Sequence, residues 1–199
     1  MRKLTLLAVI GGLFFVASFA QAQQGDAAFG FGTLISSGSC NATFICPEKG
    51  GLYPNVNLDV IFHKRIGFNF ETAWRASQGS YNGEPYRPII LDFNAIYQPR
   101  LGKKVGLDLL GGVGLQSTRF YLPYCTSSIS CNNFETSHHF LIDAGAGLRY
   151  YVWHHAFIRP EVRYYYVLNN DNTTSTLPGF SSNSLIRVGA SIGYTIGPD

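Results

Sequence analysis

Four cysteines fall into two pairs that could support redox or metal chemistry. The same number of residues separates Cys40 from Cys46 as separates Cys125 from Cys131. In an oxidising compartment each pair can close a disulfide within one loop, although four cysteines allow three connectivities and a cross-loop arrangement stays open. The spacing does not fit a zinc knuckle. We therefore predict Cys40–Cys46 and Cys125–Cys131 bridges and no metal site.

Paired histidines and paired glycines offer two further kinds of chemistry. His138-His139 and His154-His155 contain metal-ligand and general-base side chains, but adjacent residues of a strand point to opposite faces and cannot hold one ion together. Residues 112–114 and 145–147 carry a Gly-x-Gly pattern found in nucleotide loops, yet each lies inside a predicted strand with no helix after it. The sequence therefore predicts no cofactor, no metal ligand and no catalytic residue.

Charged residues at alternate positions of apolar segments form a third set. It holds six acidic and five basic side chains, so their charges nearly cancel. Carboxylates and guanidiniums pair well when both are held away from hydrocarbon, as in the lumen of a membrane barrel. The predicted lumen network comprises Asp59, Glu71, Arg75, Asp92, Asp108, Asp143, Arg149, Arg159, Glu161, Arg163 and Arg187.

The elements that position these charges are strands, because polarity alternates with a period of two residues. In one segment Val56, Leu58 and Val60 lie on one side, and Asn57 and Asp59 lie on the other. Eight segments share this pattern: residues 26–34, 55–62, 66–75, 91–98, 105–116, 142–150, 158–166 and 185–196. Pro160 cannot donate to a strand ladder, so we expect a bulge or a frayed strand start there.

The connections between these strands alternate strictly in length. Short turns at residues 63–65, 99–102 and 153–155 alternate with long segments at residues 36–51, 78–87, 117–138 and 168–184. This is the topology of a transmembrane barrel. We therefore predict an all-β, eight-stranded antiparallel up-and-down transmembrane β-barrel with its apolar face toward lipid. A soluble lipocalin-like carrier, in which the two faces exchange roles, is the alternative.

The first residues have the features of a cleaved secretory signal. Arg2 and Lys3 precede an uncharged stretch, and Ala20-Gln21-Ala22 fits a signal-peptidase site. We predict a signal peptide over residues 1–22 and a barrel domain over residues 23–199. Cleavage removes two of the 15 basic residues and leaves 13 against 12 acidic ones. A chain so close to neutral, without a basic cluster, is not expected to bind nucleic acid.

The last strand carries a motif known from barrel biogenesis. Arg187, Gly189, Ile192 and Tyr194 follow the order of polar, glycine, hydrophobic and aromatic positions in a β-signal. With this motif and the strand pattern, the chain resembles the small outer-membrane barrel superfamily that includes the OmpA transmembrane domain, OmpX and the opacity-type proteins. The resemblance implies a bacterial outer-membrane location, contact with outer-membrane lipid, insertion by the barrel assembly machinery, and a scaffold whose loops contact an extracellular ligand.

The expected work of the chain is therefore structural and not enzymatic. An eight-stranded barrel has an interior just wide enough for side chains, so we expect a plugged lumen with loops presented at the cell surface, in adhesion or another surface interaction. A small pore and a lipid A-modifying barrel enzyme remain alternatives. The enzyme would need a His-x-Ser arrangement on its lipid-facing wall, and neither His138 nor His139 is followed by serine at that offset.

Overall fold

The computed structural model describes residues 24–36, 50–62, 65–81, 84–121, 124–127, 130–132, 134–168 and 184–197. These residues form strands joined by turns, and they include no helix long and apolar enough to cross a membrane. The strands are β1 (Gln24–Ser36), β2 (Tyr53–Ile61), β3 (Ile66–Trp74), β4 (Gly79–Tyr81), β5 (Glu84–Tyr97), β6 (Val105–Phe120), β7 (Tyr124–Ser127), β8 (Ser130–Asn132), β9 (Glu135–Tyr151), β10 (Ala156–Leu168) and β11 (Ser184–Ile196).

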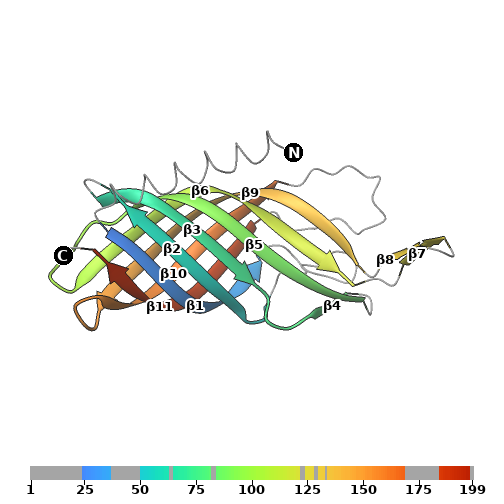
Figure 1. The fold of residues 1–199 in the computed structure, drawn as a ribbon, viewed down its shortest axis with the longest axis horizontal. Helices are drawn as coiled ribbons and strands as arrows, with labels where there is room; N and C mark the ends of the chain where they lie inside the picture. The colour runs from blue at the N-terminus through green and yellow to red at the C-terminus, as the bar shows by residue number, and fades with distance from the viewer. Residues whose placement is uncertain are drawn as a thin grey trace, which may run out of the picture.

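Eight of these strands close into a barrel, as the sequence predicted. Neighbours follow the order β3, β2, β1, β11, β10, β9, β6 and β5, and pairing of β3 with β5 completes the circle. Every pairing is antiparallel, and β1 meets β11 along the whole length of both strands. Closure leaves no long strand edge unpaired, as a barrel in hydrocarbon requires. Figure 1 shows the strands tilted around one axis.

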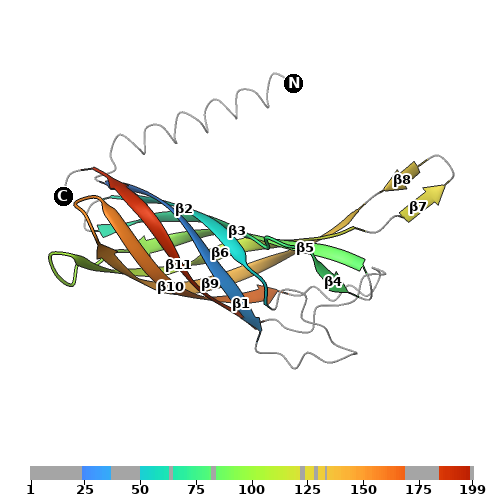
Figure 2. The ribbon, with the colours of Figure 1, turned by 90° about the horizontal axis from the view of Figure 1, so that it is seen from below.

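The two ends of the barrel differ in their connections. The end formed by residues 62–65, 98–104 and 152–155, called here the turn end, joins β2 to β3, β5 to β6 and β9 to β10. The opposite end, the loop end, carries β4 and the separate β7–β8 hairpin. Figures 1 and 2 agree that this hairpin projects beyond the barrel. The alternation of connection lengths read from the sequence corresponds to these two ends.

Three strands run farther toward the loop end than the sequence indicated. β5, β6 and β9 contain 14, 16 and 17 residues, so residues 84–87, 117–120 and 135–138 are strand where loop was predicted. Their ladders continue without a register shift, with Arg87 opposite Arg119 and Thr136 opposite Arg119. Strand beyond the hydrocarbon needs no apolar outer face, so the alternation that marks a membrane strand is lost there.

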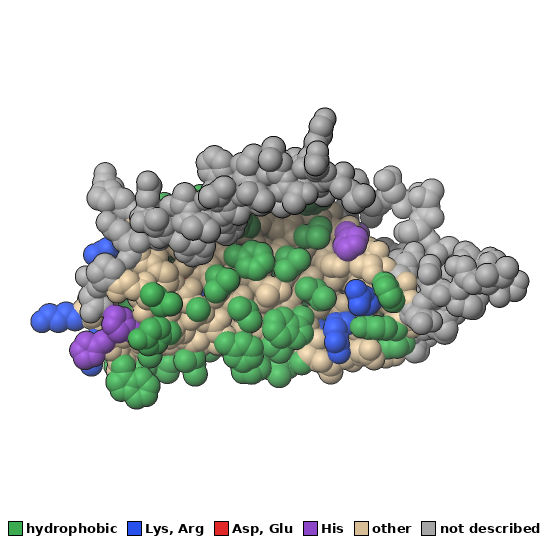
Figure 3. Space-filling model, in the orientation of Figure 1, with side chains coloured by type: hydrophobic (Ala, Val, Ile, Leu, Met, Phe, Trp, Pro, Cys, Tyr) green, Lys and Arg blue, Asp and Glu red, His purple; other side chains and the backbone are tan. Residues whose placement is uncertain are grey.

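The barrel is apolar outside and charged inside. Outward side chains such as Phe68, Tyr97 and Ile192 are 48%, 46% and 67% exposed, whereas Asp26, Asp59, Glu71, Asp92, Asp108, Asp143 and Glu161 are each at most 5% exposed. Figure 3 shows hydrophobic side chains spread over the described outer face, basic ones toward its ends, and no visible acid. A protein in water would expose the opposite set, so this outer face is a lipid-facing surface.

Pro160 interrupts a ladder but produces no bulge. It is opposite Ala190 in β11, and the β9–β10 ladder omits Arg159 and Pro160 while keeping its register on both sides. The predicted bulge is therefore wrong. A proline lacks the N–H, and the missing donor falls on the β9 side, so the strand loses a hydrogen bond without needing an extra residue.

Candidate functional site in the barrel lumen

Opposite charges in the lumen come from different parts of the chain. The buried arginines are Arg149 on β9, Arg159 and Arg163 on β10, and Arg187 on β11. Five of the buried carboxylates lie on strands earlier in the chain: Asp26 on β1, Asp59 on β2, Glu71 on β3, Asp92 on β5 and Asp108 on β6. The buried arginines thus lie on β9–β11 and most of the buried carboxylates lie on β1–β6, so the last strands of the chain attract the earlier ones inside the lumen.

The layer nearer the turn end centres on two arginines. Nη2 of Arg149 is 3.1 Å from Asp59 and 2.9 Å from Asp108, and Nη1 of the same residue pairs with Asp26. Nη1 of Arg159 lies 3.1 Å from Asp59 and 3.2 Å from Asp108. Two carboxylates are therefore each shared by two guanidiniums, which fixes the arginines in one arrangement.

The layer nearer the loop end repeats this design. Nη2 of Arg163 is 2.6 Å from Glu71, and its Nη1 is 3.0 Å from Asp92. Arg187 pairs with Glu71 as well, and its Nη2 is 2.6 Å from Glu161. Glu161 also lies 3.3 Å from Nε of Arg159, so it connects the two layers.

Buried amides complete the hydrogen bonding of these layers. Nδ2 of Asn69 donates to Asp59 at 2.5 Å, and Nδ2 of Asn94 donates to Asp92 at 2.8 Å. Oδ1 of Asn57 accepts from Nη2 of Arg163 at 3.0 Å. Their positions in the two-residue period place these asparagines on the inner face, but the predicted network contained only charged residues. A buried charge is tolerated when such neutral partners satisfy its remaining donors and acceptors.

Glycines on the inner wall make room for the arginine stems. A Cβ at Gly145 would lie 3.0 Å from Cγ of Arg163, and one at Gly147 would lie 3.1 Å from Cγ of Arg159. At Gly32 it would lie 3.2 Å from Cγ of Arg187. These contacts are tighter than side chains normally accept, so glycine at these positions lets each arginine cross the lumen close to the wall.

Three acidic or basic positions are placed differently from the predicted network. Asp26 belongs to the network but was missed, although its parity matches the inner face of β1. Arg75 lies nearer the loop end, where its Nη1 donates to the Tyr86 hydroxyl at 2.7 Å. Asp143 is 3% exposed on the inner wall, yet no arginine among the described residues is within ion-pair distance of it.

An apolar layer lies on the loop side of the lumen charges. It consists of inward side chains, each at most 2% exposed: Leu34, Tyr53, Ile90, Leu141, Tyr165, Val167 and Leu185. The sequence predicted a lumen plugged by charged side chains and did not predict an apolar layer beside them. The alternation held, but inward positions near the loop end carry apolar types, which sequence alone could not distinguish from a change of face.

The remaining predicted positions are distributed over the molecule. Cys125 and Cys131 are opposite each other in the β7–β8 hairpin, while Cys40 and Cys46 lie outside the described residues, as does the predicted signal peptide. On β11, Arg187 and Gly189 have inward parity, and Ile192 and Tyr194 face outward. None of the described His, Cys, Asp or Glu residues forms a group of three or more suited to a metal ion.

The structure contains a serine–histidine hydrogen bond, of the kind found in serine hydrolases, that the sequence did not predict. Oγ of Ser137 lies 2.7 Å from Nε2 of His139, two residues along β9. Same-face neighbours on a strand lie two residues apart, so a Ser-x-His spacing was the signal that could have revealed it. Both residues share the parity of Leu141, on the inner wall and not on the lipid-facing wall.

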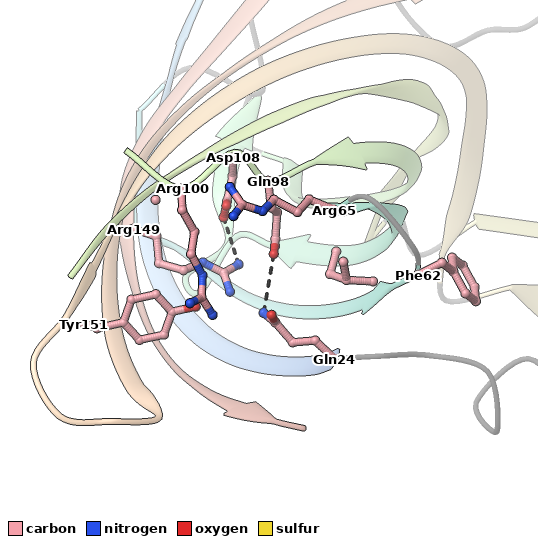
Figure 4. A pocket seen from close by; sticks show the side chains of 10 residues that line it. Gln24, Phe62, Arg65, Gln98, Arg100, Asp108, Arg149 and Tyr151 are labelled. Carbon is pink, nitrogen blue, oxygen red and sulfur yellow. Dashed lines mark hydrogen bonds and ion pairs between the residues drawn. The ribbon is translucent and has the colours of Figure 1, made fainter. Parts of the chain in front are cut away.

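A cavity of about 410 Å³ opens at the turn end, beneath the charged layers. Arg149 and Asp108 form its floor, while Arg65 and Arg100 stand at its exposed rim. Figure 4 shows the side chains of Arg100, Arg149 and Tyr151 converging on this space, whereas Phe62 points away from it. The amides of Gln24 and Gln98 line the same cavity and hydrogen-bond to each other at 3.4 Å.

Comparison with known proteins identifies the fold. The sequence matches no protein-family model and no curated protein sequence. Among solved structures, the Neisserial surface protein NspA is 14% identical, with a TM-score of 0.60 over 86% of this chain and 95% of that one. Ail of Yersinia pestis, the attachment invasion locus protein, crystallised with the heparin analogue sucrose octasulfate, is 16% identical, with a TM-score of 0.55 over 87% and 98%.

A third similar structure is the N-terminal β-barrel domain of OprF from Pseudomonas aeruginosa. It is 12% identical, with a TM-score of 0.54 over 88% of this chain and all of that one. At such identities the likeness concerns the fold alone. Together with the lipid-facing outer surface, the comparisons show that the chain has the fold of the small eight-stranded β-barrels of the bacterial outer membrane.

Proposed function

We propose that the chain is a closed outer-membrane barrel that serves as a scaffold for its loop end and conducts no ions. The observation that carries this proposal is the set of ion pairs between arginines of β9–β11 and carboxylates of β1–β6. These side chains cross the lumen at two levels. Ions passing along the barrel axis would have to displace buried guanidiniums from two or three carboxylates each, which is unfavourable in a dry interior.

The apolar layer supports the same proposal independently. Tyr53, Tyr165 and Leu185 are fully buried on the loop side of the charges. A pore of useful conductance needs a wetted path past both layers, and an eight-stranded barrel has no spare width to provide it. The function then resides at the loop end, where β5, β6 and β9 extend and the β7–β8 hairpin projects.

Planar-bilayer recording of the refolded protein tests the closed lumen. We expect no steady single-channel steps, because both layers block the axis. Insertion is verified in parallel by electrophoresis of boiled and unboiled samples, since a closed barrel resists cold detergent and migrates at another apparent mass. Reproducible conductance steps from protein that shows this mobility shift would refute the closed lumen.

Surface presentation is tested with epitope tags at the two ends. A tag between Asn170 and Asp171, in the longest undescribed connection, should be stained by antibody on intact cells. A matched tag between Trp153 and His154, in a turn-end connection, should be stained only after the outer membrane is permeabilised. Staining of the second tag on intact cells would show that the orientation is inverted.

A surface-contact role is the finer part of this proposal. The structure of Ail, an attachment protein, was solved with a sulfated heparin analogue, and the present chain shares its fold. The loop end is the part of this barrel that an extracellular ligand could reach. Binding of cells that produce the protein to immobilised host-matrix polysaccharide, compared with cells producing a variant without residues 125–131, measures this contribution directly.

Catalysis is tested at the Ser137–His139 hydrogen bond. We expect no reaction with a fluorophosphonate probe, because the pair faces the inner wall and lines neither of the two turn-end cavities. A serine nucleophile also needs donors for the developing oxyanion. Labelling that disappears in Ser137→Ala would overturn the non-enzymatic assignment.

A further inference from the structure

We propose that the turn end of the barrel is a binding site for a phosphate group. The site is the cavity of about 410 Å³ whose rim carries Arg65 and Arg100, together with an adjoining cavity of about 370 Å³. The two cavities adjoin at Arg100 and Tyr151, and together they are called here the basic recess. The closed-lumen proposal does not depend on Arg65 or Arg100, so the two proposals can fail separately.

The charge of the recess is unbalanced. Its one lining carboxylate, Asp108, is already bound to Arg149 at 2.9 Å and Arg159 at 3.2 Å. No other described carboxylate lines either cavity, and none is within ion-pair distance of Arg65 or Arg100. Lys103 and Lys104 add two more cations to the second cavity. The four fully buried arginines, Arg149, Arg159, Arg163 and Arg187, are each ion-paired, whereas Arg65 and Arg100 have no described carboxylate partner and could pair with an external anion.

The backbone holds Arg65 at a conformational cost. Its φ is 65°, in the left-handed region that favours glycine and asparagine. The Arg65 carbonyl accepts a hydrogen bond of 2.9 Å from the N–H of Gln98, which fixes the turn against β5. A glycine would relieve the strain but remove the guanidinium from the rim. Strained residues kept against such an easy alternative occur at functional sites.

Hydrogen bonds and a ring contact hold the side chains at the floor of the recess in place. Nε2 of Gln24 donates to both carboxylate oxygens of Asp26 at 3.0 Å, and Nε2 of Gln98 donates to one of them at 3.4 Å. Arg149 is packed over the Phe157 ring at 4.1 Å. These floor donors are already paired with Asp26, so an anion entering the recess would be bound by the rim guanidiniums of Arg65 and Arg100.

Phosphate is the chemistry that fits this donor set. A guanidinium fork binds phosphate oxygens in pairs, and lysines add charge without directional demand. The rim also exposes apolar surface: Trp153 is 74% exposed and Val152 40% exposed, both lining the second cavity. Such a mixture of cations and exposed aromatics matches the headgroup level of a phospholipid leaflet, while the first cavity alone could take a soluble phosphorylated solute.

The test uses the double variant R65N/R100Q, which removes two charges while asparagine keeps the left-handed turn. The matched control is R87Q/R119Q, two arginines opposite each other on the outer face at the far end of the barrel. Binding is measured on the refolded full barrel in two ways. One is titration of detergent-solubilised protein with inorganic pyrophosphate. The other is 31P NMR and thermal unfolding in nanodiscs of phosphatidylglycerol or of phosphatidylcholine.

We expect R65N/R100Q to weaken binding about tenfold or more, as loss of charge-assisted hydrogen bonds predicts, and the control to change it less than about twofold. Saturable pyrophosphate binding in detergent would identify a soluble solute as the ligand source. Binding seen only with phosphatidylglycerol would identify the lipid headgroup. The proposal is overturned if neither probe binds, or if R65N/R100Q binds as tightly as the unmodified chain.

Discussion

At the residue scale, the effect of losing a lumen charge depends on how many ion-pair partners it has. Glu71 is shared by Arg163 and Arg187, so it neutralises two guanidiniums that are fully buried. Asp143 is equally enclosed but has no described arginine within ion-pair distance. Among the described inner side chains, seven carboxylates face four ion-paired guanidiniums. The two residues should therefore respond in opposite ways to loss of charge.

We predict that Glu71→Gln destabilises the barrel by about 3 to 5 kcal/mol, because it leaves two buried guanidiniums short of a counter-ion. Asp143→Asn is the matched isosteric control and should change stability by less than about 1 kcal/mol, or raise it, since it removes a buried charge that has no described arginine within ion-pair distance. Urea unfolding in lipid vesicles measures both. An equal loss in the two variants would contradict the assignment of Glu71 as a shared partner.

Which residues would enter the lumen was readable from the sequence, but their pairing was not. Parity alone placed Asp59, Glu71 and Arg163 on the inner face. Pairing depends on strand tilt and stagger, which bring Arg149 of β9 to Asp26 of β1 across the barrel. Tilt leaves no trace in a two-residue period, so Arg75 was grouped with a layer that lies deeper, whereas Asp26 was missed although its parity was readable.

At the element scale, the strands combine a uniform outer face with an inner face of alternating bulk. On β9, Gly145 and Gly147 stand beside arginine stems of β10, while Ala144 and Ala146 face outward. Side-chain size is therefore limited at the inner positions, whereas the outer positions need an apolar side chain. Both requirements are legible in the sequence once a strand is assigned, which is why the membrane-spanning parts were predicted well. The extensions of β5, β6 and β9 meet neither requirement, so the sequence did not predict them as strand.

Gly147→Val should lower the free energy of unfolding by about 1 to 3 kcal/mol and so reduce the folded fraction. A Cβ there would already lie 3.1 Å from Cγ of Arg159, and valine adds two methyl groups. Ala146→Val, on the outward face of the same strand, is the control and should change little. The unboiled band in cold detergent electrophoresis reports the folded fraction. Equal yields of folded protein would show that the arginine stem can move aside.

The β7–β8 hairpin allows a sharper prediction about the cysteines. Directly opposed residues in an antiparallel pair have Cα atoms about 4.5 to 5.5 Å apart, within the range that a disulfide spans. Cys125 and Cys131 occupy such positions, so we predict that they are linked to each other. Non-reducing peptide mapping should recover one cross-linked peptide that contains both and that is absent from C125S/C131S. Linkage of Cys125 to Cys40 or Cys46 would contradict this pairing.

At the scale of the whole molecule, the two tryptophans mark the two ends of the lipid-facing surface. Trp74 ends β3 near the loop end with outward parity, and Trp153 lies in the turn between β9 and β10. Exposed tyrosines accompany them, including Tyr164 and Tyr194. Aromatic rings prefer the headgroup level on both sides of a bilayer, and this arrangement fixes how deep the barrel sits.

Depth-dependent fluorescence quenching measures that placement. In vesicles of brominated lipids, W153F reports Trp74 alone and W74F reports Trp153 alone, since the chain has two tryptophans. We expect both to be quenched more by bromine near the headgroups than by bromine near the chain ends. Strong quenching of either residue by chain-end bromine would place the membrane differently along the barrel axis.

The crossing ion pairs also bear on how such a barrel diverges over evolutionary time. Substitution of Glu71 removes a counter-ion from two arginines, and substitution of Arg149 removes one from three carboxylates. A single substitution in the lumen therefore destabilises the barrel until a second one restores the charge balance. Lumen positions should therefore be inherited in covarying groups that join the first half of the chain to the second. The outer face, where any apolar residue serves, is free to drift one position at a time.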